Sequence, residues 1–222
     1  MSDINNYKRG DLLVVGDPPP KLTLALAAVA DKLHQTFAVQ PWIEHREKSK
    51  ESCVLSSLAV RDFLISVGFL DAQVRPVATV MRATRGDETL HSLGIGVPGP
   101  RDRSPRHWNG HMVATTGRYL IDTTLYRANR PQWRDLPGMM ALPFRAPEDV
   151  LIYGGRPFAG ATIEVDGGAT FELLYLDTPS NTRWQDGGDV EERRREAAVA
   201  AMREHFEQGR SGDGVHLQDR TA

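Results

Sequence analysis

Residues 51–69 read ESCVLSSLAVRDFLISVGF, and they predict a helix with one apolar side that carries the only cysteine of the chain. The helix is expected over residues 52–67, with Gly68 as the stop signal directly after it. Its apolar side consists of Val54, Leu55, Leu58 and Ile65. Cys53 falls in the first turn, where unpaired backbone N–H groups and the positive end of the helix dipole favour a thiolate. A buried, unreactive thiol is the alternative, because free cysteine is among the most buried residue types.

The segments before this helix predict scaffold rather than chemistry. From Leu22 onward, apolar residues recur at intervals of three and four, which indicates an amphipathic helix that ends before Pro41. The repeating positions are Leu26, Val29, Leu33 and Phe37. Residues 1–21 include a proline run at 17–20, DPPP, which favours an extended arm. Residues 40–50 are polar and predict a loop that leads into the next helix.

After the helix of the cysteine, the pattern changes from helix-like to strand-like. Strands are expected at residues 72–81, 89–97, 110–116, 118–123, 151–153, 161–165 and 169–176. The tripeptide at 166–168, DGG, predicts a hairpin turn between the last two strands. Helices followed by consecutive strands indicate an α+β fold, in which the N-terminal helices pack on an antiparallel sheet. A charged C-terminal helix is expected over residues 189–208, and residues 209–222 are expected to be disordered.

A second stretch, residues 110–124 with the sequence GHMVATTGRYLIDTT, predicts a hairpin that brings a histidine to an aspartate. If residues 116–117 form a two-residue turn, which we favour, His111 lies directly opposite Asp122. Residues opposite one another in an antiparallel pair share a face, with Cβ atoms about 4.5–5.5 Å apart, so imidazole and carboxylate can meet. If the turn lies one residue later, His111 lies opposite Thr124 instead.

These residues together resemble a known arrangement. A His–Asp pair fixes the orientation of the imidazole and stabilises its charge, as in a catalytic triad, and a thiol would complete a site for acyl transfer. With a cysteine at a helix start, a histidine at a strand start and an aspartate in the next strand, residues 51–124 resemble the transglutaminase-like branch of the papain-like cysteine enzymes. That branch includes arylamine N-acetyltransferases and bacterial transglutaminase-like peptidases. The resemblance implies a papain-like core, with Cys53 as nucleophile, His111 as general base and acid, and Asp122 as the residue that orients His111.

One feature of the family's acetyltransferases is replaced in this chain. They usually have an Arg-Gly-Gly run just before the cysteine, where residues 48–52 read KSKES. This difference favours peptidase or amide-exchange chemistry over acetyl transfer. Gln40 and Trp42 are the candidate oxyanion donors upstream of the cysteine, with the backbone N–H of Cys53 as the other donor.

The loop before His111 and a later segment supply further candidates. Arg106, Trp108 and Asn109 are expected to bind substrate, because they lead directly into His111. Arg101, Arg103 and Arg106 are either a rim that attracts anionic groups to the site or ordinary solvated charges of a surface loop. Candidate walls of an acyl pocket, or else ordinary core residues, are Met139, Met140, Trp133 and Phe144.

Three histidines raise a metal site as an alternative. His107 and His111 have the spacing of zinc ligands on a helix, and His91 would be a third ligand. Residues 108–110, WNG, are poor helix formers, so the spacing loses its geometric meaning. We therefore expect no metal and no other cofactor.

The composition limits the partners and the location. The 222 residues include 27 Lys+Arg and 29 Asp+Glu, a net charge of −2, so no overall field attracts nucleic acid or an anionic membrane. The single cysteine excludes an intrachain disulfide and a thiolate-rich metal cage. The polar start argues against a signal peptide, and no apolar run reaches the roughly 18–20 residues of a membrane span, so a cytoplasmic location is expected.

The sequence therefore predicts a thiol-dependent enzyme that hydrolyses or transamidates a peptide or small amide substrate through a thioester. The first alternative is a transglutaminase-like fold without catalysis that acts as a binding or structural protein, and the second is a metal-dependent hydrolase. The expected organisation is an extended arm at residues 1–21, the α+β domain at 22–184, and a C-terminal helix with its tail at 185–222. The oligomeric state stays open.

Overall fold

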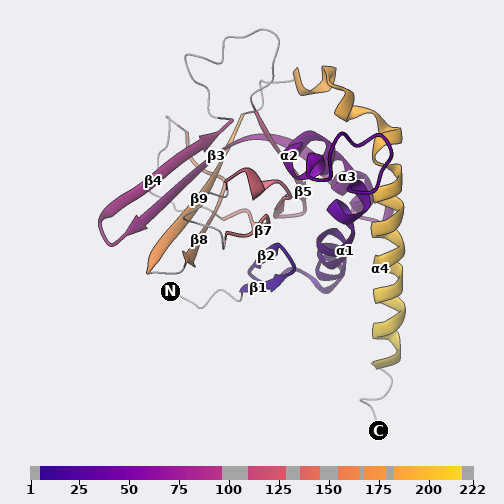
Figure 1. The fold of residues 1–222 in the computed structure, drawn as a ribbon. Helices are drawn as coiled ribbons and strands as arrows, with labels where there is room; N and C mark the ends of the chain where they lie inside the picture. Colours follow the sequence, from indigo (N-terminus) through magenta and orange to yellow (C-terminus); the bar gives the residue numbers. More distant parts are fainter. Residues whose placement is uncertain are drawn as a thin grey trace.

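The computed structural model places helices against one large curled sheet, which confirms the α+β class (Figure 1). It describes residues 6–96, 110–128, 136–145, 155–165, 168–178 and 183–216. The helices are α1 (Pro20–Phe37), α2 (Lys48–Glu51), α3 (Cys53–Ser66) and α4 (Glu196–His216), with short 3-10 turns η1 (Leu125–Ala128), η2 (Arg183–Asp186), η3 (Gly188–Val190) and η4 (Glu192–Arg194). The strands are β1 (Asn6–Arg9), β2 (Leu12–Val15), β3 (Gln73–Arg85), β4 (Glu88–Ile95), β5 (His111–Thr116), β6 (Tyr119–Asp122), β7 (Met139–Pro143), β8 (Ala159–Val165) and β9 (Ala169–Asp177).

Among the described residues, nine strands form a single sheet in the order β1-β2-β7-β6-β5-β3-β9-β8, and β4 pairs with β3. Every pair is antiparallel except β2 with β7, so the predicted antiparallel sheet is correct for all but that pair. The long strand β3 organises the sheet. Its first half pairs with β5 and its second half with β4 along one edge, and β9 lies along the other edge.

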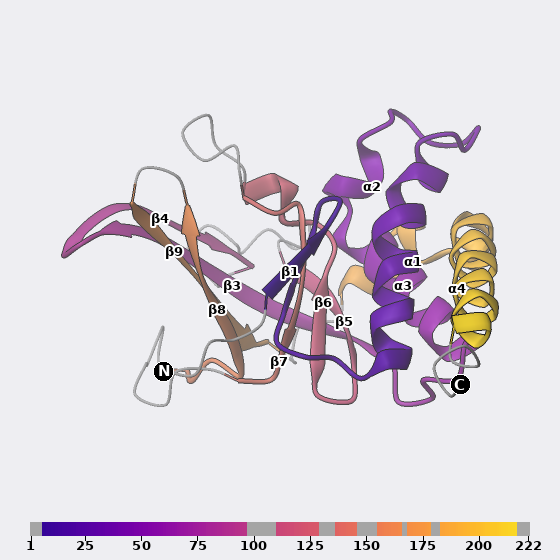
Figure 2. The same cartoon turned by 90° about the horizontal axis from the view of Figure 1, so that it is seen from below.

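The helices cover one face of this sheet in two layers (Figure 2). Helix α3 packs directly on β5, and α4 lies outermost against α1 and α3. Because side chains alternate along a strand, the strands supply two separate cores. Ala114 and Ile121 face the helices, whereas Val113 and Leu120 fill the inside of the curl. Strand β5 is therefore buried along its whole length.

The predicted helices are confirmed with changes at their ends. Pro20 is the first residue of α1, a position that tolerates proline because its missing N–H would have no partner there. Helix α3 spans Cys53–Ser66, one residue shorter at each end than the predicted 52–67, because Ser52 is its N-cap. Helix α4 begins at Glu196 rather than at residue 189 and continues to residue 216, so the disorder expected for 209–216 is wrong. Residues 217–222 lie outside the described part of the chain.

Several segments outside the predicted elements contribute to the sheet or to the helices. The expected arm at residues 1–21 contains β1 and β2, which form a hairpin that joins the sheet through β7, so it is not a separate extended arm. Strand β7 was not predicted, because the short run MMALP ends in proline and lacks the alternation of a strand. The predicted loop at 40–50 is correct up to residue 47, whereas residues 48–50 already belong to the short helix α2. The strand expected at 151–153 lies outside the described residues. None of the described helices is long and apolar enough to cross a bilayer.

Candidate active site

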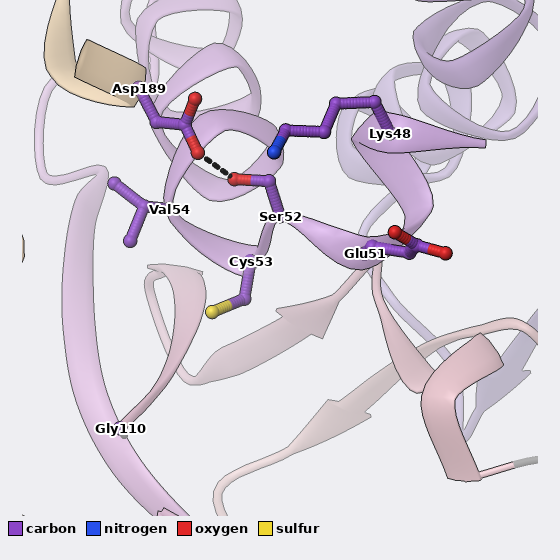
Figure 3. A pocket seen from close by; sticks show the side chains of 7 residues that line it. All are labelled: Lys48, Glu51, Ser52, Cys53, Val54, Gly110 and Asp189. Carbon is purple, nitrogen blue, oxygen red and sulfur yellow. Dashed lines mark hydrogen bonds between the residues drawn. The ribbon is translucent and has the colours of Figure 1, made fainter. Parts of the chain in front are cut away.

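Cys53 is the first residue of α3, and its thiol points into a pocket with a volume of about 570 Å³ (Figure 3). Ser52 caps the helix, because its Oγ accepts a hydrogen bond from the backbone N–H of Leu55 at 3.3 Å. The cap fixes where the helix starts and therefore where the thiol lies. The pocket is lined by Lys48, Glu51, Ser52, Cys53, Val54, Gly110 and Asp189.

A buried histidine and aspartate meet beside this thiol. The Nε2 of His111 lies 2.6 Å from the Oδ2 of Asp122, and their side chains are 3% and 0% exposed. The same oxygen of Asp122 accepts a hydrogen bond from the hydroxyl of Tyr175 at 3.0 Å, and Oδ1 accepts one from the N–H of Thr124 at 3.0 Å. Three donors thus fix the carboxylate in place.

The hairpin that carries this pair adopts the other of the two registers considered. Thr116 pairs with Tyr119, so residues 117–118 form the turn, and the prediction that His111 lies directly opposite Asp122 is wrong. The change of pairing amounts to two residues, and side chains on a strand alternate with a period of two. His111 and Asp122 therefore still share a face and meet diagonally, within reach of long side chains.

A distant carboxylate explains the choice of turn. Gly117 has a φ of +55°, in the left-handed region that favours glycine. The carboxylate of Asp71 accepts one hydrogen bond from the Gly117 N–H at 2.5 Å and another from the hydroxyl of Thr116 at 2.8 Å. Because Asp71 lies more than forty residues earlier in the chain, the hairpin sequence alone contains no sign of this clamp.

The imidazole of His111 is held in its charged form. Burial is the largest single influence and opposes the charge, but the Asp122 carboxylate and the Cys53 thiol together raise the pKa of His111 to about 10. Since Nε2 is bonded to Asp122, Nδ1 is the ring nitrogen left for the thiol. The cysteine, histidine and aspartate predicted to form a triad are thus brought together.

Comparison with known proteins identifies no relative. No protein-family model, no curated protein and no solved structure matches the chain. The chemistry is therefore argued from the geometry of the site.

Tyr175 on β9 is a site residue that sequence reasoning missed. It is fully buried, and its pKa is raised well above the ordinary value by burial and by the Asp122 carboxylate, so the phenol keeps the proton that it donates. The only local signal was a tyrosine in the otherwise apolar run LLYL. Its place beside Asp122 depends on the pairing of β9 with β3, which no pattern in the sequence specified.

The C-terminal segment forms one wall of the pocket. Ser52 Oγ donates to the Oδ2 of Asp189, in η3, at 2.5 Å, as Figure 3 shows. Arg195, which is buried, forms an ion pair with Asp62 on α3 and donates to the backbone oxygen of Val190 at 2.7 Å. These bonds hold residues 188–195 against α3, so the segment predicted to follow the domain as an appendage belongs to the site.

The two predicted oxyanion residues have other partners and do not line the pocket of the thiol. The Nε2 of Gln40 donates to the backbone oxygen of Thr36 at 3.2 Å. Trp42 packs edge-on against Phe37, with ring centroids 6.1 Å apart. Neither residue lines the pocket of the thiol, so neither prediction holds for the side chains. Among the described pocket residues, the backbone N–H of Cys53 remains as a donor to a developing oxyanion.

The expected acyl pocket is part of the core. Met139 and Met140 are 2% and 0% exposed and lie in the two cores, and Phe144 packs against Phe158 with ring centroids 5.4 Å apart. Of the two alternatives for these three residues, ordinary core is therefore correct and the acyl-pocket wall is not. Other candidates lie outside the described residues, namely Arg101, Arg103, Arg106, His107, Trp108, Asn109 and Trp133.

The three-histidine alternative fails on distance. His91 pairs with Ala83 of β3, and His111 pairs with Val77 of the same strand. Six residues of strand separate these positions, which corresponds to about 20 Å, far beyond two ligands of one metal ion. Within the ranges that the structure describes, no three His, Cys, Asp or Glu side chains are grouped to hold a metal.

Proposed function

We propose that this chain is a thiol-dependent acyl-transfer enzyme of the transglutaminase-like type, with Cys53, His111 and Asp122 as its triad. One observation carries the proposal: a buried imidazole, held by a carboxylate at 2.6 Å, interacts with a thiol that opens on a pocket at a helix N-terminus. The helix of the thiol packs on the sheet of the imidazole and carboxylate, as expected of a papain-like core.

The geometry supports a two-step reaction. The thiolate of Cys53 attacks the carbonyl carbon of an amide, and a C–S bond forms while the carbonyl oxygen takes up negative charge near the Cys53 N–H. His111 then gives its proton to the leaving nitrogen, the C–N bond breaks, and a thioester remains. In the second step, water or an amine loses a proton to His111, attacks the thioester and releases the thiolate.

The pocket favours a polar substrate. Its lining includes Lys48, Glu51 and Asp189, so charges of both signs surround the thiol. The methionines that would have accommodated an apolar acyl chain are buried in the cores instead. A peptide or a small polar amide therefore fits this site better than a long-chain acyl donor. A reaction that depends on a free thiol also fits the reducing cytoplasm, which is the location that we propose.

A protein that keeps the fold without catalysis is the second candidate. The observation in its favour is that neither Gln40 nor Trp42 lines the pocket, which leaves the backbone N–H of Cys53 without either predicted second donor. Such a protein would bind a partner or ligand and would leave the thiol no more reactive than free cysteine. Thiol reactivity therefore separates the two candidates.

The test is the pH dependence of Cys53 alkylation by iodoacetamide, in the wild type and in His111→Ala. We expect fast labelling at pH 6 in the wild type and loss of that advantage in the variant, because the imidazolium stabilises the thiolate. Mass spectrometry after incubation with p-nitrophenyl acetate should then show an acyl group on Cys53, removed faster when a primary amine is added if transamidation occurs. Labelling that requires unfolding would refute the triad and leave the binding protein.

A further inference from the structure

A second histidine, His34 on α1, lies in a buried hydrogen-bond network next to the triad. The proposed reaction does not use this histidine. Its side chain bridges two other segments. Nδ1 lies 2.8 Å from the Oγ of Ser49 on α2, and Nε2 lies 2.8 Å from the backbone oxygen of Thr123. The residue is only 8% exposed, so both bonds are shielded from water.

The two partners determine the tautomer of this ring. A carbonyl oxygen can only accept, so Nε2 of His34 carries the proton and donates it to Thr123, while Nδ1 accepts from the hydroxyl of Ser49. Burial lowers the pKa of His34 to about 4, which keeps the ring neutral at neutral pH. Both hydrogen bonds therefore persist under the conditions in which the triad would work.

Each partner lies close to a member of the triad. Thr123 directly follows Asp122, and Ser49 lies four residues before Cys53. The backbone oxygen of Ser49 also accepts a hydrogen bond at 2.5 Å from the Oγ of Ser56, one turn into the nucleophile's helix. His34 thus connects the segment that carries the carboxylate to the segment that starts the helix of the thiol.

We propose that His34 is a positioning residue: by bridging Ser49 and Thr123, it sets the distance between the thiol of Cys53 and the His111–Asp122 pair. This inference rests on the proposed function. An apolar side chain could fill the same place between α1 and the sheet, but it could not join the two segments. Buried polar groups destabilise a fold unless all are paired, and here both ring nitrogens are paired.

The test compares His34→Gln, His34→Leu and the control Thr116→Val by iodoacetamide labelling of Cys53 from pH 5 to pH 10 and by urea unfolding. A glutamine amide can donate to Thr123 and accept from Ser49, whereas leucine can do neither. The control removes the 2.8 Å bond from Thr116 to Asp71 at the far end of the same hairpin. It should lower stability without changing the labelling profile.

We expect Cys53 in His34→Leu to label about tenfold more slowly at pH 6–7. A factor of ten corresponds to roughly the net free energy of one hydrogen bond. Labelling of this variant should approach the profile of an ordinary thiol, which ionises near pH 8.5. His34→Gln should keep most of the wild-type rate. If His34→Leu does not fold, Ser49→Ala breaks only one bridge and should shift the profile in the same direction by less.

Two results would overturn the inference, and they differ from failure of the proposed function. If His34→Leu folds and labels with the wild-type profile, His34 only stabilises the fold. If His34→Leu does not fold, a folded Ser49→Ala protein with the wild-type profile leads to the same conclusion. Equal slowing in the leucine and glutamine variants would show that the bridge is not the cause. If the wild type itself labels like free cysteine, the proposed function fails, and this inference fails with it.

Discussion

Replacing Asp122 with asparagine tests the electrostatics of the site most directly. The side chain keeps its shape, and the amide oxygen can still accept from Tyr175 or Thr124, but the negative charge is lost. Burial, the largest influence on the pKa of His111, then lowers that pKa without the opposing effect of the Asp122 carboxylate. We therefore expect the pKa of His111 to fall from about 10 to below its ordinary 6.5, so that the imidazole is neutral at pH 7.

The consequence for the thiol can be measured in two ways. Without a charged imidazole beside it, Cys53 should react with iodoacetamide at pH 7 on the order of 10- to 100-fold more slowly, because the thiolate is the reactive form and loses the cation that stabilises it. A histidine NMR titration should show His111 protonated up to about pH 10 in the wild type and neutral at pH 7 in the variant. Asp71→Asn, which changes the carboxylate at the other end of the hairpin, is the matched control.

The sign of the stability effect follows from the same shift. Because the folded pKa of His111 lies above the unfolded value of about 6.5, its charge stabilises the fold fully below pH 6.5. That contribution is lost as the pH rises through about 10, so urea midpoints of the wild type should fall across this range while those of Asp122→Asn change less. A variant whose His111 stays protonated at pH 7 would refute the reasoning.

Three further substitutions probe the support of the triad. Tyr175→Phe removes only the hydroxyl that donates to the Asp122 carboxylate, so urea unfolding should show a free energy of unfolding lower by about 1.5–3 kcal/mol. NMR should still find the His111 imidazole protonated at pH 7. A wild-type urea midpoint would contradict this. Ser52→Ala removes both the cap of α3 and the hydrogen bond to Asp189, and should cost about 2 kcal/mol in the same assay. A Cβ at Gly96 would lie 2.7 Å from the Val77 oxygen and 2.8 Å from the His111 nitrogen, so Gly96→Ala should slow Cys53 labelling at pH 7. Gly86→Ala, at a similar positive φ but in open space, should show the cost of the backbone alone and leave the labelling unchanged.

The parts of the fold that the sequence predicted are those with local signals. The helix of Cys53 has its cap, its apolar side and its stop glycine within seventeen residues, and it forms almost as expected. The parts that it missed depend on distant partners. The hairpin turn is decided by Asp71, the hydroxyl beside Asp122 comes from Tyr175, and the pocket wall comes from Asp189.

The pair of His111 and Asp122 was predicted correctly although its register was wrong, and the reason is geometric. Sequence alternation determines the face of a side chain, and a pairing error of two residues leaves every face unchanged. An error of one residue would have placed the imidazole and the carboxylate on opposite sides of the sheet. The sequence therefore determined which face of the sheet each side chain occupies, but not the exact register of the strands.

The same alternation explains why the histidine stands at the start of its strand. His111 faces the inside of the curl with Asp122 and Tyr175, whereas α3, the helix of Cys53, packs on the other face. Its neighbour Met112 faces α3 and packs against Cys53, where an imidazole would lose the carboxylate. Only at the start of β5, close to the start of α3, can one ring contact groups on both faces of the sheet. The thiol, the imidazole and the carboxylate therefore meet at the start of this strand, because a side chain within the strand reaches only one face.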